Sequence, residues 1–154
     1  MNLEQLISQI DESRSWFLKL VSGLTESQWD ARAYPNAKTP KETLAHLVIA
    51  DRCMPDFFAG KEPDYEAYAP DSNLSATELL NLLNQTHRAK LDFLREKFTG
   101  ANLDTQIQTV YSGMKPIWVE LVSICHEDWY HIGQVSMIRQ GSDPEFDYYA
   151  TFYS

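Results

Sequence analysis

The chain has 154 residues, of which 44% are hydrophobic and 23% charged, a composition typical of one ordinary globular domain. Its 22 acidic residues outnumber 13 basic ones, and the formal net charge of -9 argues against the basic surface that nucleic-acid binding needs. No apolar run approaches the roughly 20 residues of a membrane span, and no basic and then apolar leader opens the sequence. We therefore predict a single domain over residues 1–154, located in the cytoplasm, that acts on a small molecule and binds neither nucleic acid nor a membrane.

The first half of the chain predicts two helices. Apolar residues recur at steps of three and four over residues 3–24, which is the spacing of one helical face. Thr39, Pro40 and Glu42 then combine a capping threonine, a proline at the first helical position and a glutamate three residues after the cap. A second helix is therefore expected from about residue 40, with Pro55 kinking or ending it.

The second half predicts two more helices. A polar loop over residues 60–74 leads to a capping pattern that opens a helix over about residues 75–98. Residues 101–114 hold strand-prone side chains without sustained alternation, so we expect a short extended connection there. The last long helix is expected over about residues 116–140, with Gly141 as its cap. Four long helices in one domain predict an all-α four-helix bundle.

The C-terminal tail, residues 141–154, is rich in aromatic side chains. Such rings seldom stay in contact with water, so we expect the tail to pack on the domain or on a partner subunit. The tail and the two apolar stripes of the second helix lead us to predict a homodimer. The tail's aromatic residues are Phe146, Tyr148, Tyr149, Phe152 and Tyr153.

The last long helix carries an acid and an imidazole on an apolar stripe. Glu127 and His131 share this stripe by the three-and-four rule with Ile124, Val135 and Ile138. A buried carboxylate is normally paired or bound to a metal, so we expect a partner for Glu127. His131 lies one turn away, and ligands at this spacing can both reach one cation.

A third ligand has to come from another helix, and we predict His46. It lies on the second helix, on a stripe with Ile49, Ala50 and Cys53. Two histidines and one carboxylate leave open coordination positions, which is typical of a catalytic metal site. The alternative interpretation is that His46 is a core histidine bonded to a carbonyl group, and that the two residues of the last helix form an ion pair only.

The other candidates near this site are less well placed. His126 is an alternative ligand, but it precedes His131 by five residues and would need a bulge in the helix to face the same ion. Asp128 could accept an imidazole N–H, although an exposed helix charge is the role that we expect. His87 is expected between helices rather than at a metal. Cys53 lies two turns from His46 and cannot bind the same ion.

Two segments of the chain resemble the DinB/YfiT-like superfamily of metalloenzymes. These segments are LTESQWDARAYPNAKTPKETLAHLVIADR and HEDWYHIGQVSMIRQ, and the resemblance covers nearly the whole chain. It implies a four-helix bundle, generally dimeric, with a divalent metal ion, often zinc or nickel, held by one histidine of the second helix and an (i, i+4) pair of the last helix. Many members have two histidines in that pair, whereas this chain has Glu127 four residues before His131. The mycothiol-dependent maleylpyruvate isomerase branch is similar in having glutamate there, which favours His46, Glu127 and His131.

For some relatives the resemblance implies a thiol-dependent transferase or isomerase reaction. In that chemistry a metal lowers the pKa of a low-molecular-weight thiol and so produces a thiolate nucleophile. Two other functions stay open on the sequence, namely a non-catalytic protein that binds a metal or small ligand, and a metal-dependent hydrolase. The sequence predicts neither the catalytic residues nor the substrate.

Overall fold

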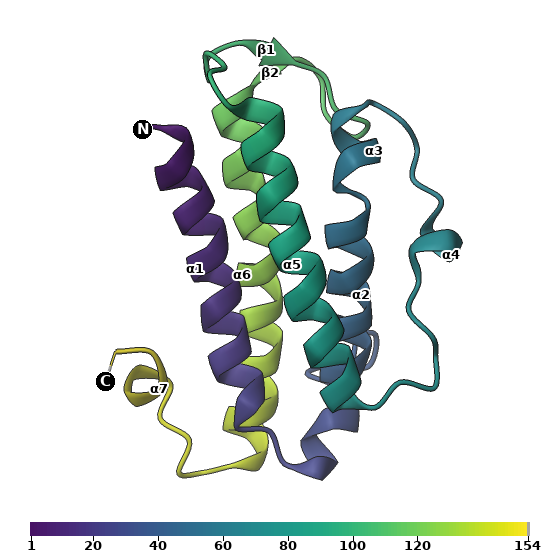
Figure 1. Cartoon of the computed structure of the whole chain (residues 1–154). Coiled ribbons are helices and arrows are strands. Elements are labelled where there is room, and N and C mark those ends of the chain that lie inside the picture. The colour runs from purple at the N-terminus through teal and green to yellow at the C-terminus, as the bar shows by residue number, and fades with distance from the viewer. Residues whose placement is uncertain (154) are drawn as a thin grey trace.

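A computed structural model describes residues 1–153 as an all-α bundle in which four long helices lie side by side (Figure 1). The predicted four-helix bundle is therefore confirmed. The long helices are α1 (Leu3–Ser22), α2 (Pro40–Arg52), α5 (Ala76–Phe98) and α6 (Ile117–Ser142). None of the helices within residues 1–153 combines the length and the apolar character that a membrane span requires.

Short elements connect the long helices. A 3-10 turn follows α1, and a five-residue helix continues α2 after a break at Cys53. The expected extended connection before α6 is a two-stranded antiparallel hairpin in which Gln106 pairs with Pro116. These elements are η1 (Glu26–Asp30), α3 (Met54–Phe58), α4 (Tyr65–Tyr68), β1 (Gln106–Ile107), β2 (Lys115–Pro116) and α7 (Tyr148–Tyr153).

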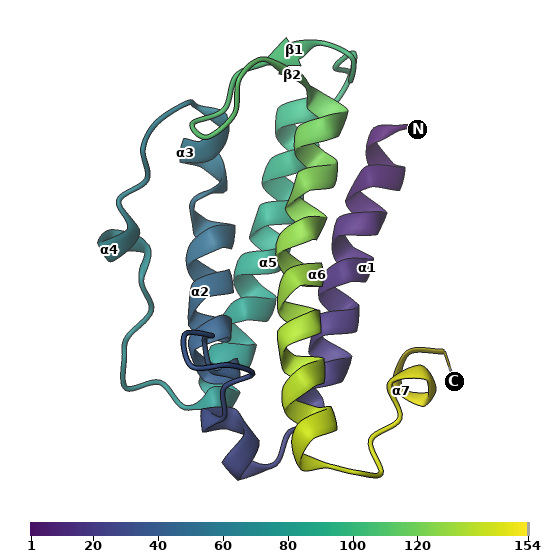
Figure 2. The same cartoon turned by 180° about the vertical axis from the view of Figure 1, so that it is seen from behind.

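The four long helices run in two opposite directions along the bundle. In Figures 1 and 2, α1 and α6 run in one direction along the bundle, and α2 and α5 run in the other. A long segment that contains α4 returns along the outside of α2 before α5 begins. Helix α1 packs mainly against α6, and α2 packs mainly against α5. This arrangement makes α2 and α6 antiparallel neighbours, which is the pair that the predicted metal site needs.

Local signals begin the helices where expected. The Thr39 side chain accepts a hydrogen bond from the Glu42 amide, and the Glu42 side chain accepts from the Thr39 amide, so both capping contacts at the start of α2 are made. Ser75 and Glu78 make the same reciprocal contacts at the start of α5. Gly141 is not the cap of α6, because the helix continues through Ser142 and Asp143 follows as the cap. Gly141 does not adopt the positive φ with which a glycine ends a helix; among the glycines only Gly60 and Gly100 do.

The bundle core consists of two apolar clusters with a layer of buried polar side chains between them. One cluster includes Phe17, Leu47 and Val135, and the other includes Ile10 and Leu94. The polar layer lies where the helices pass from one cluster to the other, and each long helix contributes to it. Its charged members are Arg14, Asp51, Lys90 and Asp128, each at most 4% exposed.

The C-terminal tail folds back on the bundle. Helix α7 contacts α1, and the Phe152 ring stacks on the Trp16 ring with 4.9 Å between their centroids. Phe152 is buried, whereas Tyr149 and Tyr153 are exposed. Aromatic contacts within the chain therefore account for part of the tail. That residues 1–154 form one domain, and that the protein is a homodimer, stay predictions.

Candidate functional site

Three ligand atoms from two antiparallel helices meet in the middle of the bundle. His46 projects from α2, and Glu127 and His131 project from α6 one turn apart. Their ligand atoms all lie within 4.8 Å of one another. The Glu127 Oε1 atom lies 2.6 Å from His46 Nε2 and 3.2 Å from His131 Nε2. The structure thus brings together the three residues that the sequence selected as metal ligands.

The three residues differ in burial, and the prediction that Glu127 is buried is wrong. The sequence stripe predicted a buried carboxylate, but 46% of the Glu127 side chain is exposed. His46 is also partly open, with 34% of its side chain exposed, whereas His131 is buried at 2%. The stripe of α6 reaches the edge of the core at this level, where Ile124 packs on an apolar cluster and also lines a cavity. The site is therefore anchored in the core through His131 and open to a ligand through Glu127.

Electrostatics keep the carboxylate ionised. The contacts of Glu127 with His131 and then with His46 hold the pKa of Glu127 well below its usual range, although partial burial acts in the opposite direction. An ionised oxygen beside two imidazole nitrogens forms a negatively charged site when both rings are neutral. Such a site attracts a cation.

Gln134 and two tyrosines determine which nitrogen of His131 faces the site. Gln134 Oε1 lies 2.8 Å from His131 Nδ1, and Gln134 Nε2 donates to the hydroxyls of Tyr34 and Tyr130, both at 3.0 Å. The two hydroxyls also lie 3.0 Å apart. With this amide orientation all three contacts can contain a proton, whereas the flipped amide would leave the contact between the hydroxyls without one. In this orientation Gln134 Oε1 accepts the hydrogen bond of the His131 Nδ1–H group.

This tautomer leaves the Nε2 atom of His131 facing the Glu127 carboxylate. The two atoms lie 3.2 Å apart, and Nε2 lies on the side of the ring that Gln134 does not occupy, so one ligand can reach both atoms. Metal-bound histidines commonly donate their other N–H to an acceptor, as His131 does to Gln134. This network was not predicted from the sequence, although Gln134 lies three residues after a candidate ligand, where a helical side chain can reach it.

The donor set and its spacing fit a tetrahedral metal ion. Ligand atoms at about 2.0 to 2.2 Å from such an ion lie about 3.4 Å from one another. The contact between Glu127 and His131 is close to this value, and the contact between Glu127 and His46 has to lengthen. The two residues of the shorter contact are the partly exposed ones, so they have room to move. Two imidazoles and a carboxylate leave one position open for a further ligand.

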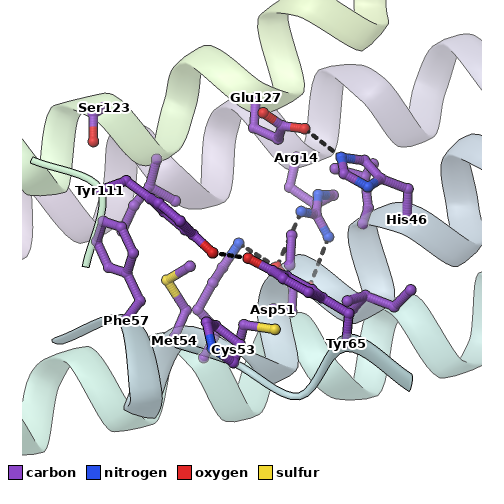
Figure 3. A pocket seen from close by; sticks show the side chains of 16 residues that line it. Arg14, His46, Asp51, Cys53, Met54, Phe57, Tyr65, Tyr111, Ser123 and Glu127 are labelled. Atoms are coloured by element: carbon purple, nitrogen blue, oxygen red, sulfur yellow. Dashed lines mark hydrogen bonds and ion pairs between the residues drawn. The ribbon is translucent and has the colours of Figure 1, made fainter. Parts of the chain in front are cut away.

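A cavity of about 500 Å³ opens beside the three residues, between α2 and α6. Figure 3 shows His46 and Glu127 pointing toward one another at one side, with Met54 and Phe57 on the far side. The hydroxyls of Tyr65 and Tyr111 meet across the cavity, although α4 carries one residue and the hairpin loop the other. The α4 residue lies in the segment 60–74, which we had expected to be a polar loop only.

Buried charges line the inner end of the cavity and overturn the expectation for Asp128. Asp128 is 1% exposed and accepts hydrogen bonds from Arg14 Nε at 2.8 Å and Ser13 Oγ at 3.0 Å, so it is neither an exposed charge nor a partner of His131. Arg14 also donates to Asp51 at 2.9 and 3.2 Å, and Lys90 Nζ lies 2.6 Å from Asp51. A signal for this network was present, because each of these charges interrupts an apolar helical stripe.

The remaining candidates lie outside the group of three. His126 is exposed, and α6 passes through it as uninterrupted α-helix, without the bulge that this alternative ligand would need. His87 is buried between α5 and α1, where its Nε2 atom lies 2.9 Å from Asp11. Cys53 is buried and lines the cavity, while Cys125 belongs to one of the apolar clusters.

Comparisons with known proteins agree with this architecture. A crystal structure of the mycothiol-dependent maleylpyruvate isomerase superposes with a TM-score of 0.66 at 17% identity, covering 88% of this chain and 61% of that chain. A histidine-to-alanine mutant of the same enzyme superposes with a TM-score of 0.62 over the same shares. This chain thus spans about three fifths of the length of those proteins, and at this identity the likeness shows the fold alone. No curated protein sequence matches the chain. Residues 9–135 match the DinB superfamily, and this match over most of the sequence shows that the chain belongs to that family.

Proposed function

We propose that this protein is a divalent-metal-dependent enzyme that activates a low-molecular-weight thiol for transfer to, or isomerisation of, a small molecule. The observation that supports the proposal is the convergence of His46, Glu127 and His131 within 4.8 Å at the edge of a cavity. Two solved structures with the same fold are of a mycothiol-dependent isomerase, which supports a thiol as co-substrate. Zinc and nickel are the ions that we propose, because imidazole ligands suit both.

Each ligand residue has a distinct part in this proposal. His46 and His131 supply neutral nitrogen ligands, and Glu127 supplies one negative charge. A divalent ion held there would carry a net charge of about +1 and would lower the pKa of a thiol bound at the open position. Gln134 fixes the ring of His131, and the apolar cavity wall keeps water away from the thiolate.

The proposed transfer step has a simple electron balance. The thiol proton passes to solvent, and a sulfur electron pair then forms a bond to an electrophilic carbon of the small molecule. In a transfer the leaving group departs with the electron pair of the bond that breaks. In an isomerisation the electron pair moves into the substrate on addition, and the carbon–sulfur bond breaks again after rotation.

Metal binding is the first test of this function. We expect protein purified without chelating resin, stripped and titrated with Zn²⁺ or Ni²⁺ in a calorimeter, to bind about one ion per chain. His46→Ala and His131→Ala should abolish binding, and Glu127→Gln should weaken it, since it removes the anion at constant volume. His126→Ala is the matched control on the same helix and should bind like the parent. Loss of metal in His126→Ala with retention in Glu127→Gln would refute the ligand set.

Turnover separates an enzyme from a binding protein. A thiol-conjugation assay with a chromogenic electrophile should show turnover that depends on the added ion and is lost in His131→Ala. Metal binding without turnover over a panel of thiols would favour the non-catalytic binding function. Light scattering on the same preparations tests the predicted homodimer, and a monomer at micromolar concentration would reject it.

A further inference from the structure

The cavity beside the proposed metal site has walls that offer a ligand little but apolar contact. Carbon and sulfur atoms dominate these walls, and the two tyrosine hydroxyls at the entrance already bond to each other. The Ser123 hydroxyl donates to the Glu120 carbonyl at 2.7 Å, so it is also occupied. The main apolar residues are Leu47, Ile49, Ala50, Met54, Phe57 and Ile124.

Both cations that line the cavity are neutralised within the protein. Arg14 bonds to Asp51 and Asp128, and Lys90 bonds to Asp51. Two positive charges thus face two negative ones, and Thr86 adds a further hydrogen bond to Asp51. An anionic ligand would have to displace a buried carboxylate from its partners, which is strongly unfavourable because it leaves a buried charge unpaired.

The entrance also disfavours anions. Tyr111 donates to the Glu62 carboxylate at 3.1 Å on the outer side of the cavity, and the chain as a whole carries a net charge of -9. The one cationic group that this site would gain is the proposed metal ion. Its net charge of about +1 is cancelled when a thiolate binds. No positive charge is then left for a second anion.

We propose that this cavity binds the second substrate, and that this substrate is an uncharged, apolar small molecule. The inference rests on the proposed function, because it treats the cavity as the place of the molecule that the thiol attacks. The cavity volume of about 500 Å³ lies within the roughly 300 to 1,000 Å³ of small-molecule sites. Apolar area removed from water supplies the affinity, and an unpaired carboxylate or sulfonate on the same molecule opposes it.

A matched pair of dyes tests this selectivity without metal, thiol or turnover. N-phenylnaphthylamine is uncharged, and anilinonaphthalenesulfonate has the same ring system with one added anion; both fluoresce when they leave water. We expect the metal-free protein to bind the uncharged dye at least about tenfold more tightly, which corresponds to about 1.4 kcal/mol. Equal affinities, or tighter binding of the sulfonate, would overturn the inference while leaving the proposed metal and thiol chemistry untouched.

One substitution should reverse the selectivity. Met54→Lys replaces an unbranched cavity side chain by another of similar length and adds a cation to the cavity wall. We expect this variant to bind the sulfonated dye more tightly and the uncharged dye more weakly. Met137→Lys makes the same change on the exposed face of α6 and should alter neither affinity. Unchanged affinities in Met54→Lys would place the dyes elsewhere and refute the assignment of this cavity.

Discussion

Asp51 holds two buried cations, and replacing it by asparagine should destabilise the protein strongly. Its carboxylate bonds to Arg14 and Lys90 with only 1% of the side chain exposed. Burial alone would raise the pKa of Asp51, but Lys90 and Arg14 outweigh burial and hold that pKa below its usual value. Asp51→Asn keeps the shape and leaves three buried charges where there were four, so Lys90 loses its counter-ion.

The expected magnitude is large compared with the stability of a domain. Removing one partner of a buried ion pair costs about 3 to 5 kcal/mol, against a total of about 5 to 15 kcal/mol. At about 2 to 4 °C per kcal/mol, the melting temperature should fall by about 6 to 20 °C. Urea denaturation followed by circular dichroism gives the free energy of unfolding directly. The control is Asp92→Asn, whose side chain is 80% exposed and whose change should stay within about 0.5 kcal/mol.

Two further measurements distinguish an unpaired cation from general disruption. Asp51→Asn/Lys90→Met removes the cation together with its partner and should be more stable than Asp51→Asn. In Asp51→Asn the folded state disfavours the Lys90 ammonium group, so the unfolded chain binds the Lys90 proton more tightly than the folded chain does. The free energy of unfolding of this variant should therefore rise with pH up to about 10.4. A melting temperature for Asp51→Asn equal to that of Asp92→Asn would refute this reasoning.

Three further predictions concern His87, Gln134 and the tail. Burial and then Lys90 and Arg14 lower the pKa of His87 from 6.5 to about 4, although the charge of Asp51 and the hydrogen bond with Asp11 act in the opposite direction. The free energy of unfolding should therefore fall by about 3 kcal/mol as pH drops from about 6.5 to 4. Urea titrations of His87→Gln should show a smaller loss over the same pH range. Gln134→Leu should weaken Zn²⁺ binding about 10- to 100-fold in calorimetry. The same variant should shift the His131 tautomer in nitrogen NMR of the metal-free protein. Gln134→Glu keeps an acceptor and should preserve that tautomer. Phe152→Ala should lower the free energy of unfolding by about 3 to 5 kcal/mol in urea denaturation, because Phe152 is buried. Tyr149 is exposed, so Tyr149→Ala should change that free energy little. Equal values for the two variants would contradict the packing of α7.

The helices were predictable because local signals determine them. The capping residues before α2 and α5 and the three-and-four spacing of apolar residues depend only on neighbours along the chain. The end of α6 was predicted too early, at Gly141, because a glycine ends a helix only when the chain turns there. The short helix α4 was missed because four residues are too few for a periodic signal.

The candidate site was partly predictable for the same reason. The (i, i+4) pair Glu127 and His131 follows from helix geometry, and the unbroken course of α6 leaves His126 outside the group. Asp128 was assigned wrongly because its role depends on Arg14, a residue 114 positions away in the chain. Contacts between distant segments leave no periodic trace, although a charge within an apolar stripe, such as Arg14, indicates that some partner exists.

The polar layer also determines which residues of α2 and α6 face each other. A slip of α2 by one turn would move Asp51 about 5.4 Å from Arg14 and leave buried charges unpaired. The same slip would separate His46 from Glu127, which lie 2.6 Å apart between Nε2 and Oε1. The register that satisfies the ion pairs is thus the register that assembles the candidate site. We therefore expect Asp51→Asn, measured at a temperature where it stays folded, to bind Zn²⁺ more weakly than Asp92→Asn in calorimetry. Equal affinities would show that the α2 and α6 ligands keep their alignment without the ion pairs.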